Sequence, residues 1–227
     1  MLKSVVDILH EIDFFNSLTP EEYQKVSDIS TLSSYSKNSI LYYEDDTINR
    51  IYFLVSGLIK VYKLDKFDNE IFLYHIYKNN MISELTTIDS KSIYCFSNAE
   101  FIEEGVVLSI DFEKFKKEFL QTNILTIKFI EEILAKTHQL QCIVNRELVF
   151  DATAKVAYML SHDLPMFNKL KRQEVSFMLH IQPETLSRVI KRLQRNGIIG
   201  IENSDIKIID ADKLQAVFKG NQNEKDD

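Results

Sequence analysis

The sequence predicts an α+β protein with an N-terminal antiparallel β-barrel, a long helix and a C-terminal winged helix-turn-helix. Three observations lead to this fold class. Residues 31–110 alternate short runs rich in Ile, Val, Tyr and Phe with turn-like stretches. Residues 111–146 contain neither glycine nor proline, as a long helical segment requires. Residues 148–210 change to short helical patterns that end in two short strands.

Composition places the chain among ordinary globular proteins. Its 227 residues are 45% hydrophobic and 27% charged, which allows one or two domains with a buried core. Its apolar runs stay below the roughly 18 residues that a membrane span needs. The N-terminal stretch MLKSVVDILHEIDFF carries acidic residues and no small-residue cleavage site. We therefore expect a cytoplasmic protein that does not contact a membrane.

Strands are expected after an N-terminal helical region, residues 1–30, in which Thr19, Pro20 and Glu22 form an N-cap signature. Many short strands at close spacing are typical of a small antiparallel barrel or sandwich. Gly57 lies between two apolar runs, where a bend or bulge needs a residue without Cβ. The expected strands are SILYYE, RIYFLVSGLIKVYKL, EIFLYHIY and GVVLSID.

The helical stretch predicts a short amphipathic helix, DFEKFKKEFL, and then a longer helix with a coiled-coil seam. Apolar or small residues recur in the longer helix at spacings of four and three, which is the seam pattern of paired helices. Because the seam is short, it could instead pack on the protein's own barrel. The seam residues are Thr126, Ile130, Ile133, Thr137, Leu140 and Val144.

The C-terminal part predicts three helices and a hairpin. Pro183 is well placed in the first turn of the third helix, and Gly197 stands at its C-terminal stop. Two helices joined by a tight turn and followed by a β-hairpin form a winged helix-turn-helix. The helices are FDATAKVAYMLSHDL, RQEVSFML and PETLSRVIKRLQRN, and the hairpin strands are IIGIE and IKIID. The predicted segments are therefore residues 1–110 (barrel with N-terminal helices), 111–147 (dimerisation helix), 148–220 (winged helix-turn-helix) and 221–227 (disordered tail).

One face of the third helix carries groups that suit base reading in the major groove of DNA. Arg188 can give two hydrogen bonds to guanine, Glu184 can accept one from cytosine, and Ser187 can reach a base edge or a phosphate. Leu186, Val189, Ile190 and Leu193 form the opposite, apolar face. The candidate DNA-binding residues are Glu184, Ser187, Arg188, Lys191, Arg192, Arg195, Arg172 and Thr185, of which Lys191, Arg192 and Arg195 suit phosphates.

Charge supports this interpretation locally. The chain has a net charge of -7, yet residues 171–195 carry six cations against two carboxylates. The alternative is a solvated surface helix in which Glu184 and Arg188 form an ordinary i, i+4 pair. The hairpin and the preceding helix favour the DNA-binding interpretation.

Other classes of protein are disfavoured. Two cysteines, Cys95 and Cys142, cannot form a disulfide framework or supply a four-cysteine iron–sulfur cluster. The chain lacks the G-x-S-x-G, P-loop, H-E-x-x-H and dinucleotide motifs, so we expect that it is not an enzyme. A small-molecule or redox sensor of the same fold, acting through another ligand or without one, remains the alternative.

The chain resembles the Crp/Fnr superfamily of bacterial transcription regulators. The resemblance lies in YYEDDTINRIYFLVSGLIKVYKL, in ISEL and in RQEVSFMLHIQPETLSRVIKRLQRNGII. It implies a jelly-roll, cyclic-nucleotide-binding-like sensory domain, a homodimer, and partners that include double-stranded DNA and RNA polymerase. Glu184, Ser187 and Arg188 match the E-x-x-S-R pattern of the Fnr branch, which implies a TTGAT-like palindrome. The chain departs from the family at Lys171, often a threonine N-cap, and at His180, often a glycine whose position needs a positive φ.

The family's ligand pocket is changed in this sequence. The resemblance places the pocket at Glu84, Leu85, Tyr94 and Cys95. Ser83 replaces the family's glycine, and Ile93 and Tyr94 stand where Arg and Ser bind a cyclic nucleotide's phosphate. No arginine lies between Arg50 and Arg146, and a lysine such as Lys91 is a poor substitute for the bidentate guanidinium. We therefore expect that cAMP and cGMP do not bind.

Haem is the remaining cofactor candidate. In IQPETLSR and in the changed nucleotide site, the sequence is similar to the dissimilatory nitrate respiration regulators, which respond to nitric oxide. This likeness implies a role in nitrosative stress. Haem needs an axial ligand, usually a histidine. The chain has five histidines, His10, His75, His138, His162 and His180, and none lies in a motif that can be carried over from the family. The candidates named here are His75, His138 and His10. Alternatively, Cys95 and Cys142 could pair as a redox switch.

Overall fold

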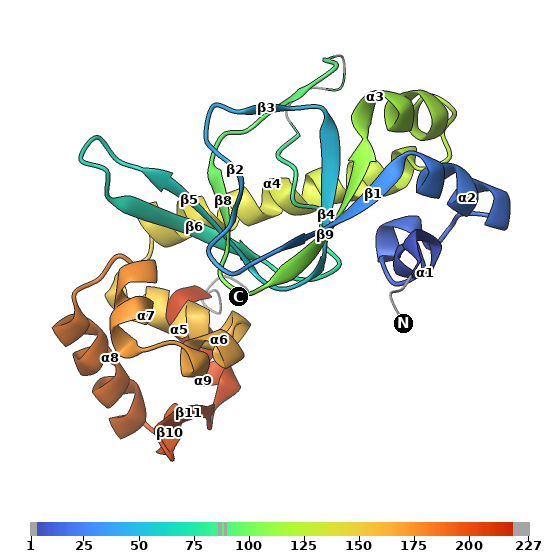
Figure 1. The fold of residues 1–227 in the computed structure, drawn as a ribbon. Helices are drawn as coiled ribbons and strands as arrows, with labels where there is room; N and C mark the ends of the chain where they lie inside the picture. Colours follow the sequence, from blue (N-terminus) through green and yellow to red (C-terminus); the bar gives the residue numbers. More distant parts are fainter. Residues whose placement is uncertain (1–3, 86–87, 89, 220–227) are drawn as a thin grey trace, which may run out of the picture. The chain divides into compact units, whose positions relative to one another are not determined.

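The computed structural model describes residues 4–85, 88 and 90–219 (Figure 1). The chain divides into two compact units, residues 1–138 and 139–227, and each is described by itself. The predicted tail, residues 221–227, lies outside the described residues. No helix in the described part of the chain is both long and apolar enough to cross a membrane.

The first unit begins with helices that the sequence identifies correctly. They are α1 (Val5–Leu9), the short 3₁₀ helix η1 (Asp13–Phe15) and α2 (Pro20–Asp28). The Thr19 side chain accepts a hydrogen bond from the Glu22 N–H, and the Glu22 carboxylate accepts the Thr19 N–H at 2.8 Å. This reciprocal cap satisfies two backbone donors at the start of α2, as the N-cap signature predicts.

The strands of the first unit form antiparallel sheets. A three-stranded sheet has the order β1-β9-β4, a four-stranded sheet has the order β2-β8-β5-β6, and β3 pairs with β7. The bounds are β1 Ser30–Tyr35, β2 Ile40–Tyr42, β3 Thr47–Ile48, β4 Arg50–Ser56, β5 Ile59–Leu64, β6 Glu70–Ile76, β7 Ile93–Tyr94, β8 Asn98–Phe101 and β9 Gly105–Asp111. The sequence predicts the runs that contain β2, β4, β5, β6 and β9 but not β1, β3, β7 or β8.

The predicted antiparallel jelly roll is confirmed, and among the described residues its sheets do not join into a closed ring. The fold is a jelly roll in which the chain passes from one sheet to another. At the end of β4 its pairing with β9 shifts register between Leu54 and Ser56, and Gly57 follows with φ +92°. A Cβ at Gly57 would lie 2.6 Å from the Glu104 carbonyl oxygen, so the bend predicted here does require glycine.

Alternating residues of the three-stranded sheet contribute to two cores. Ile51 and Phe53 of β4 pack with the helices of this unit, including Phe15, whereas Leu54 faces the four-stranded sheet with Val61 of β5. Successive side chains of a strand point to opposite faces of the sheet, so a strand with both faces buried contributes to a core on each side. The sheet is therefore packed between a helical layer and the second sheet.

Two helical segments follow β9, as the sequence predicts. The first is α3 (Phe112–Phe115), which continues into η2, a π-helical segment (Lys116–Leu120). The second is α4 (Thr126–Leu148). Leu125 and Phe129 anchor the start of α4 in the helical core. Of the seam residues predicted on α4, Ile130, Ile133, Leu140 and Val144 are 36–56% exposed.

The second unit contains the last turns of α4 and a small helical domain with a hairpin. The helices are α5 (Ala152–His162), α6 (Leu164–Lys169), α7 (Arg172–Met178), α8 (Pro183–Arg195) and α9 (Ala211–Lys219), and the hairpin is β10 (Ile199–Glu202) with β11 (Asp205–Ile208). The sequence predicts α5, α7, α8 and both strands but not α6 or α9. In α9, Phe218 packs edge-to-face on Tyr158 of α5, with ring centroids 5.4 Å apart.

Candidate nucleic-acid interface

Helix α8 has the two faces that its sequence predicts. Leu186, Val189, Ile190 and Leu193 are buried against the core of the second unit. The opposite face is exposed and carries Glu184, Ser187, Arg188 and Lys191. Arg192 and Arg195 are also exposed, near the C-terminal end of the helix. A helix of thirteen residues is thus fixed by its apolar face while its polar face remains open to a partner.

The polar side chains of α8 are partly ordered by the helix itself. The Arg188 guanidinium donates to the Thr185 hydroxyl at 3.1 Å, and the Ser187 hydroxyl donates to the Pro183 carbonyl at 3.0 Å. Thr185 is half-buried, so it can hold Arg188 in place. A guanidinium has five N–H donors, which leaves Arg188 able to form two parallel bonds to a planar partner.

Two of the predicted contact residues are engaged within the domain. The Arg192 guanidinium donates to the Thr153 hydroxyl of α5. Arg172 is half-buried, donates to the Ser204 carbonyl at 3.3 Å, and lies 4.8 Å above the Phe167 ring. Burial lowers the pKa of Arg172. Arg172 therefore joins α7 to the turn of the hairpin, whereas the other predicted residues lie on or beside the open face of α8.

The turn between α7 and α8 has the backbone that the sequence predicts. His180 has φ +51°, in the left-handed region that usually favours glycine. The His180 N–H donates to the Phe177 carbonyl, and the Ile181 N–H donates to the Ser176 carbonyl, both at 3.0 Å, and these bonds close the end of α7. Lys171, at the N-cap of α7, has no capping hydrogen bond from its side chain, but the Glu174 carboxylate accepts its N–H at 2.7 Å.

The imidazole of His180 contacts a carboxylate that the sequence does not single out. Its Nδ1 lies 2.9 Å from Oε2 of Glu147, in the last turn of α4. Glu147 also accepts hydrogen bonds from Arg146 at 2.7 Å and from Lys155 of α5 at 3.0 Å. Burial alone raises the pKa of Glu147, but these three donors outweigh it and lower the pKa to about 2. The carboxylate thus ties the end of α4 to the helix-turn-helix.

We expect Glu147→Gln to destabilise the protein by about 2 kcal/mol at pH 7, because it removes the charge that three donors share. The folded-state pKa lies below the ordinary value of 4.5, so this stability is present above about pH 5 and is lost as the pH falls toward 2. Urea denaturation of both proteins from pH 7 to pH 3 measures it. Glu202→Gln, which alters an exposed pair with Lys207, is the matched control and should change little. Equal free energies of unfolding for Glu147→Gln and the parent at pH 7 would contradict this assignment.

The predicted ligand-pocket residues make separate contacts within the first unit. Glu84 accepts hydrogen bonds from the Phe96 N–H at 2.8 Å and the Ser97 hydroxyl at 2.7 Å. Tyr94 donates its hydroxyl to Asp45, and Leu85 packs against the helical core. Cys95 is buried, and burial, with Glu84 and Asp46 nearby, raises the pKa of its thiol to about 12.

The three histidines proposed as haem ligands come from three different elements of the first unit. His10 is exposed beside the Tyr23 ring, with centroids 3.9 Å apart, and His75 lies on β6 beside the Phe72 ring at 4.8 Å. His138 is exposed on α4. In the described part of the chain, His, Cys, Asp and Glu side chains do not form groups of three that could hold a metal ion. Cys95 and Cys142 are not joined by a disulfide in the structure.

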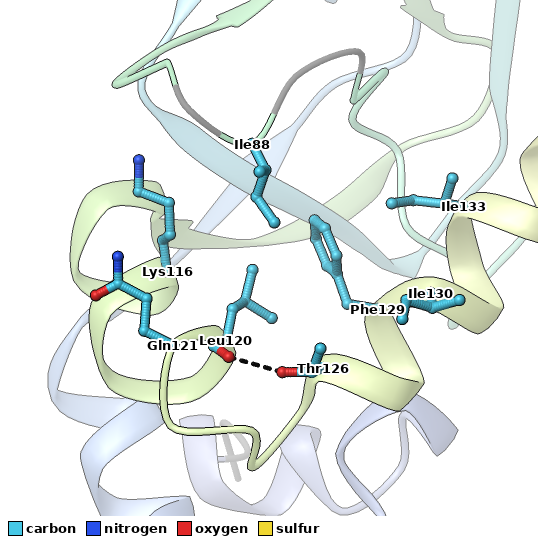
Figure 2. A pocket seen from close by; sticks show the side chains of 8 residues that line it. All are labelled: Ile88, Lys116, Leu120, Gln121, Thr126, Phe129, Ile130 and Ile133. Atoms are coloured by element: carbon cyan, nitrogen blue, oxygen red, sulfur yellow. Dashed lines mark hydrogen bonds between the residues drawn. The ribbon is translucent and has the colours of Figure 1, made fainter.

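A cavity of about 540 Å³ lies elsewhere in the first unit, between η2 and the start of α4 (Figure 2). None of the three histidines, and none of the four predicted ligand-pocket residues, lines it. The sequence gives little signal for this cavity, because its walls come from segments whose contacts depend on the fold. The residues that line it are Ile88, Lys116, Leu120, Gln121, Thr126, Phe129, Ile130 and Ile133.

Comparisons with known proteins agree with both units. Residues 32–122 match the family model of the cyclic nucleotide-binding domain, and residues 155–217 match that of the Crp-like helix-turn-helix domain. The chain is 25% identical to the anaerobic regulatory protein of Bacillus subtilis over 199 residues, which covers 82% of this chain and 83% of that protein. It is 22% identical to the transcriptional activator protein anr of Pseudomonas aeruginosa, over 90% of this chain and 87% of that protein. The solved structure of a CooA mutant from Carboxydothermus hydrogenoformans has the same fold, with a TM-score of 0.70, 20% identity and 95% of each chain covered.

Proposed function

Because the chain belongs to the Crp/Fnr family of transcription regulators, we propose that it acts as a homodimer that binds a TTGAT-like palindrome and changes its affinity in response to a signal at the jelly roll. DNA in bacteria lies in the cytoplasm, where we place the protein and where RNA polymerase is the partner expected of such a regulator.

The observation that carries this proposal is the exposed polar face of α8. Arg188, Glu184 and Ser187 lie near the N-terminal half of a helix that its apolar face fixes to the domain. That is the part of a recognition helix that enters the major groove. Lys191, Arg192 and Arg195 follow along the same helix, where phosphates lie in such complexes.

The exposed apolar residues of α4 support the dimer. Ile130, Leu140 and Val144 are 46–56% exposed, although they follow the spacing of paired helices. Burying this stripe against a second copy removes apolar area from water. Two joined subunits also place two recognition helices about 34 Å apart, one turn of DNA, as a palindrome requires.

Selection of bound duplexes from a random DNA library tests this proposal. We expect enrichment of palindromes with TTGAT-like half-sites whose centres are about one helical turn apart. The Glu184→Ala, Arg188→Ala double variant should lose this enrichment while it keeps the parent's melting temperature, because both side chains are exposed. Enrichment of unrelated or non-palindromic sequences would contradict the proposal that the dimer binds a TTGAT-like palindrome.

We propose further that the signal is not a cyclic nucleotide. In cyclic-nucleotide-binding members a glutamate takes the ribose hydroxyl and an Arg-Ser pair takes the phosphate. Here the Glu84 carboxylate is already engaged by Phe96 and Ser97, and Tyr94 stands at the serine position. Isothermal titration calorimetry with cAMP should therefore show no heat of binding, and micromolar binding would overturn this point.

Haem, with a response to nitric oxide in nitrosative stress, stays a prediction with a direct test. The described histidines do not fit a haem in the cavity between η2 and α4, since none of them lines it. An absorbance spectrum taken before and after addition of haem and nitric oxide decides the matter. A Soret band that shifts with nitric oxide supports haem. Its absence favours a sensor of the same fold that uses another ligand or none.

A further inference from the structure

The cavity between η2 and α4 has the size and lining of a site for a small apolar molecule. Its volume of about 540 Å³ lies within the range of ligand pockets, about 300–1,000 Å³. Figure 2 shows Ile88, Leu120 and Phe129 converging on the space, with Ile130 and Ile133 of α4 at one side. The walls are therefore mainly apolar, and they connect the segment after β9 to α4.

A π-helical segment forms one wall of the cavity. Lys116 and Leu120 are the first and last residues of η2, and both line the space. π-Helical turns are rare and occur frequently at functional sites. The segment is also well anchored, because Phe115 before it and Phe119 within it are fully buried in the helical core.

Lys116 gives the cavity a cationic group. The side chain is half-buried, its ammonium donates to the Ser90 carbonyl at 3.1 Å, and it lies 5.5 Å from the centroid of the Phe112 ring. The Ser90 carbonyl and the Phe112 ring are both neutral, so neither balances the charge of the ammonium. An ammonium removed from water is stabilised by an anion, so the cavity offers one charged contact at the edge of an apolar space.

We infer that this cavity binds an apolar carboxylate of medium chain length, with the chain against Leu120, Phe129 and Ile133 and the carboxylate on Lys116. The site is separate from Glu84, Tyr94 and Cys95. Ile130 and Ile133 also belong to the seam of α4, so the ligand lies beside the dimer contact of the proposed function. This inference rests on the proposed function, because it names the class of molecule that would act as the signal. Binding of that molecule to the cavity can still be measured in the absence of DNA.

Calorimetric titration of the full chain with dodecanoate below its micellar concentration tests the site. We expect saturable binding, at least about tenfold weaker binding of uncharged dodecanol, and a similar loss in Lys116→Gln, because a charge-assisted hydrogen bond is removed. Ile88→Trp, which fills the cavity from a partly exposed position, should abolish binding. Lys117→Gln removes the neighbouring, exposed charge and should bind as the parent does.

Thermal denaturation of each variant shows that it folds. No binding of dodecanoate to the parent, equal binding of dodecanol, or equal affinities of Lys116→Gln and Lys117→Gln would overturn the inference. DNA binding by the same preparations is measured separately. A protein that binds its palindrome but not dodecanoate would refute this site and leave the proposed function standing.

Discussion

Leu140→Glu is expected to convert the protein to a monomer and to lower its affinity for a palindromic duplex by at least about 100-fold. Leu140 is 56% exposed on α4, within the proposed seam, so its own subunit does not need it for folding. In a dimer, two glutamates would face each other across an apolar contact, and both the desolvation of the charges and their repulsion oppose association. A monomer holds one recognition helix and can read one half-site at a time.

Sedimentation equilibrium and fluorescence anisotropy with a labelled palindrome measure the two effects of this substitution. Ala135→Glu is the matched control, because it places the same charge at an exposed position on another face of α4. The control should remain dimeric and bind DNA as the parent does. A monomeric Leu140→Glu with unchanged affinity for the palindrome would show that dimerisation does not support DNA binding.

Arg188→Ala is expected to weaken binding by roughly 1–3 kcal/mol on the cognate sequence and to relax the preference for one guanine in each half-site. The side chain is exposed on α8 and held by Thr185. A bidentate pair with guanine is lost when either partner changes. Replacing that guanine should therefore weaken DNA binding by the parent strongly and DNA binding by the Arg188→Ala variant only slightly.

A cycle of four anisotropy measurements separates base reading from phosphate contact. It combines the parent and the Arg188→Ala variant with the cognate duplex and with a duplex that carries adenine in place of the guanine. Arg195→Ala is the control, since a phosphate contact weakens binding uniformly on both duplexes. If Arg188→Ala also weakens both duplexes equally, the side chain contacts phosphate alone.

The features that the sequence predicts correctly are those set by local patterns. The apolar positions of α8, the cap of α2 at Thr19 and the positive φ at His180 each follow from residues a few positions apart. The exposed polar face of α8 could be located in the same way. The periodicity of apolar residues predicts which side of α8 is buried. In a helix-turn-helix the opposite side of the second helix is exposed to solvent.

The features that the sequence does not predict depend on contacts between distant segments. The three donors to Glu147 come from α4, α5 and the turn before α8, up to 33 residues away. The cavity likewise takes its walls from Ile88, η2 and α4. Strand β1 has the mostly polar sequence STLSSY, which does not indicate a strand. It is a strand because it pairs with β9. The order of the strands in each sheet is not predicted either, because strand spacing in the sequence does not determine which strands pair.

The dependence of DNA affinity on salt, measured for the palindrome and for a scrambled duplex of equal length, tests whether α8 reads DNA in a dimer. If the exposed face of α8 in each of two subunits binds DNA, log K should fall with log salt at a slope of roughly −5 or steeper. The palindrome should also bind about 10³-fold more tightly than the scrambled duplex near physiological salt. Equal affinities for the two duplexes, or an affinity that does not change with salt, would show that α8 is not a sequence-specific DNA-binding surface.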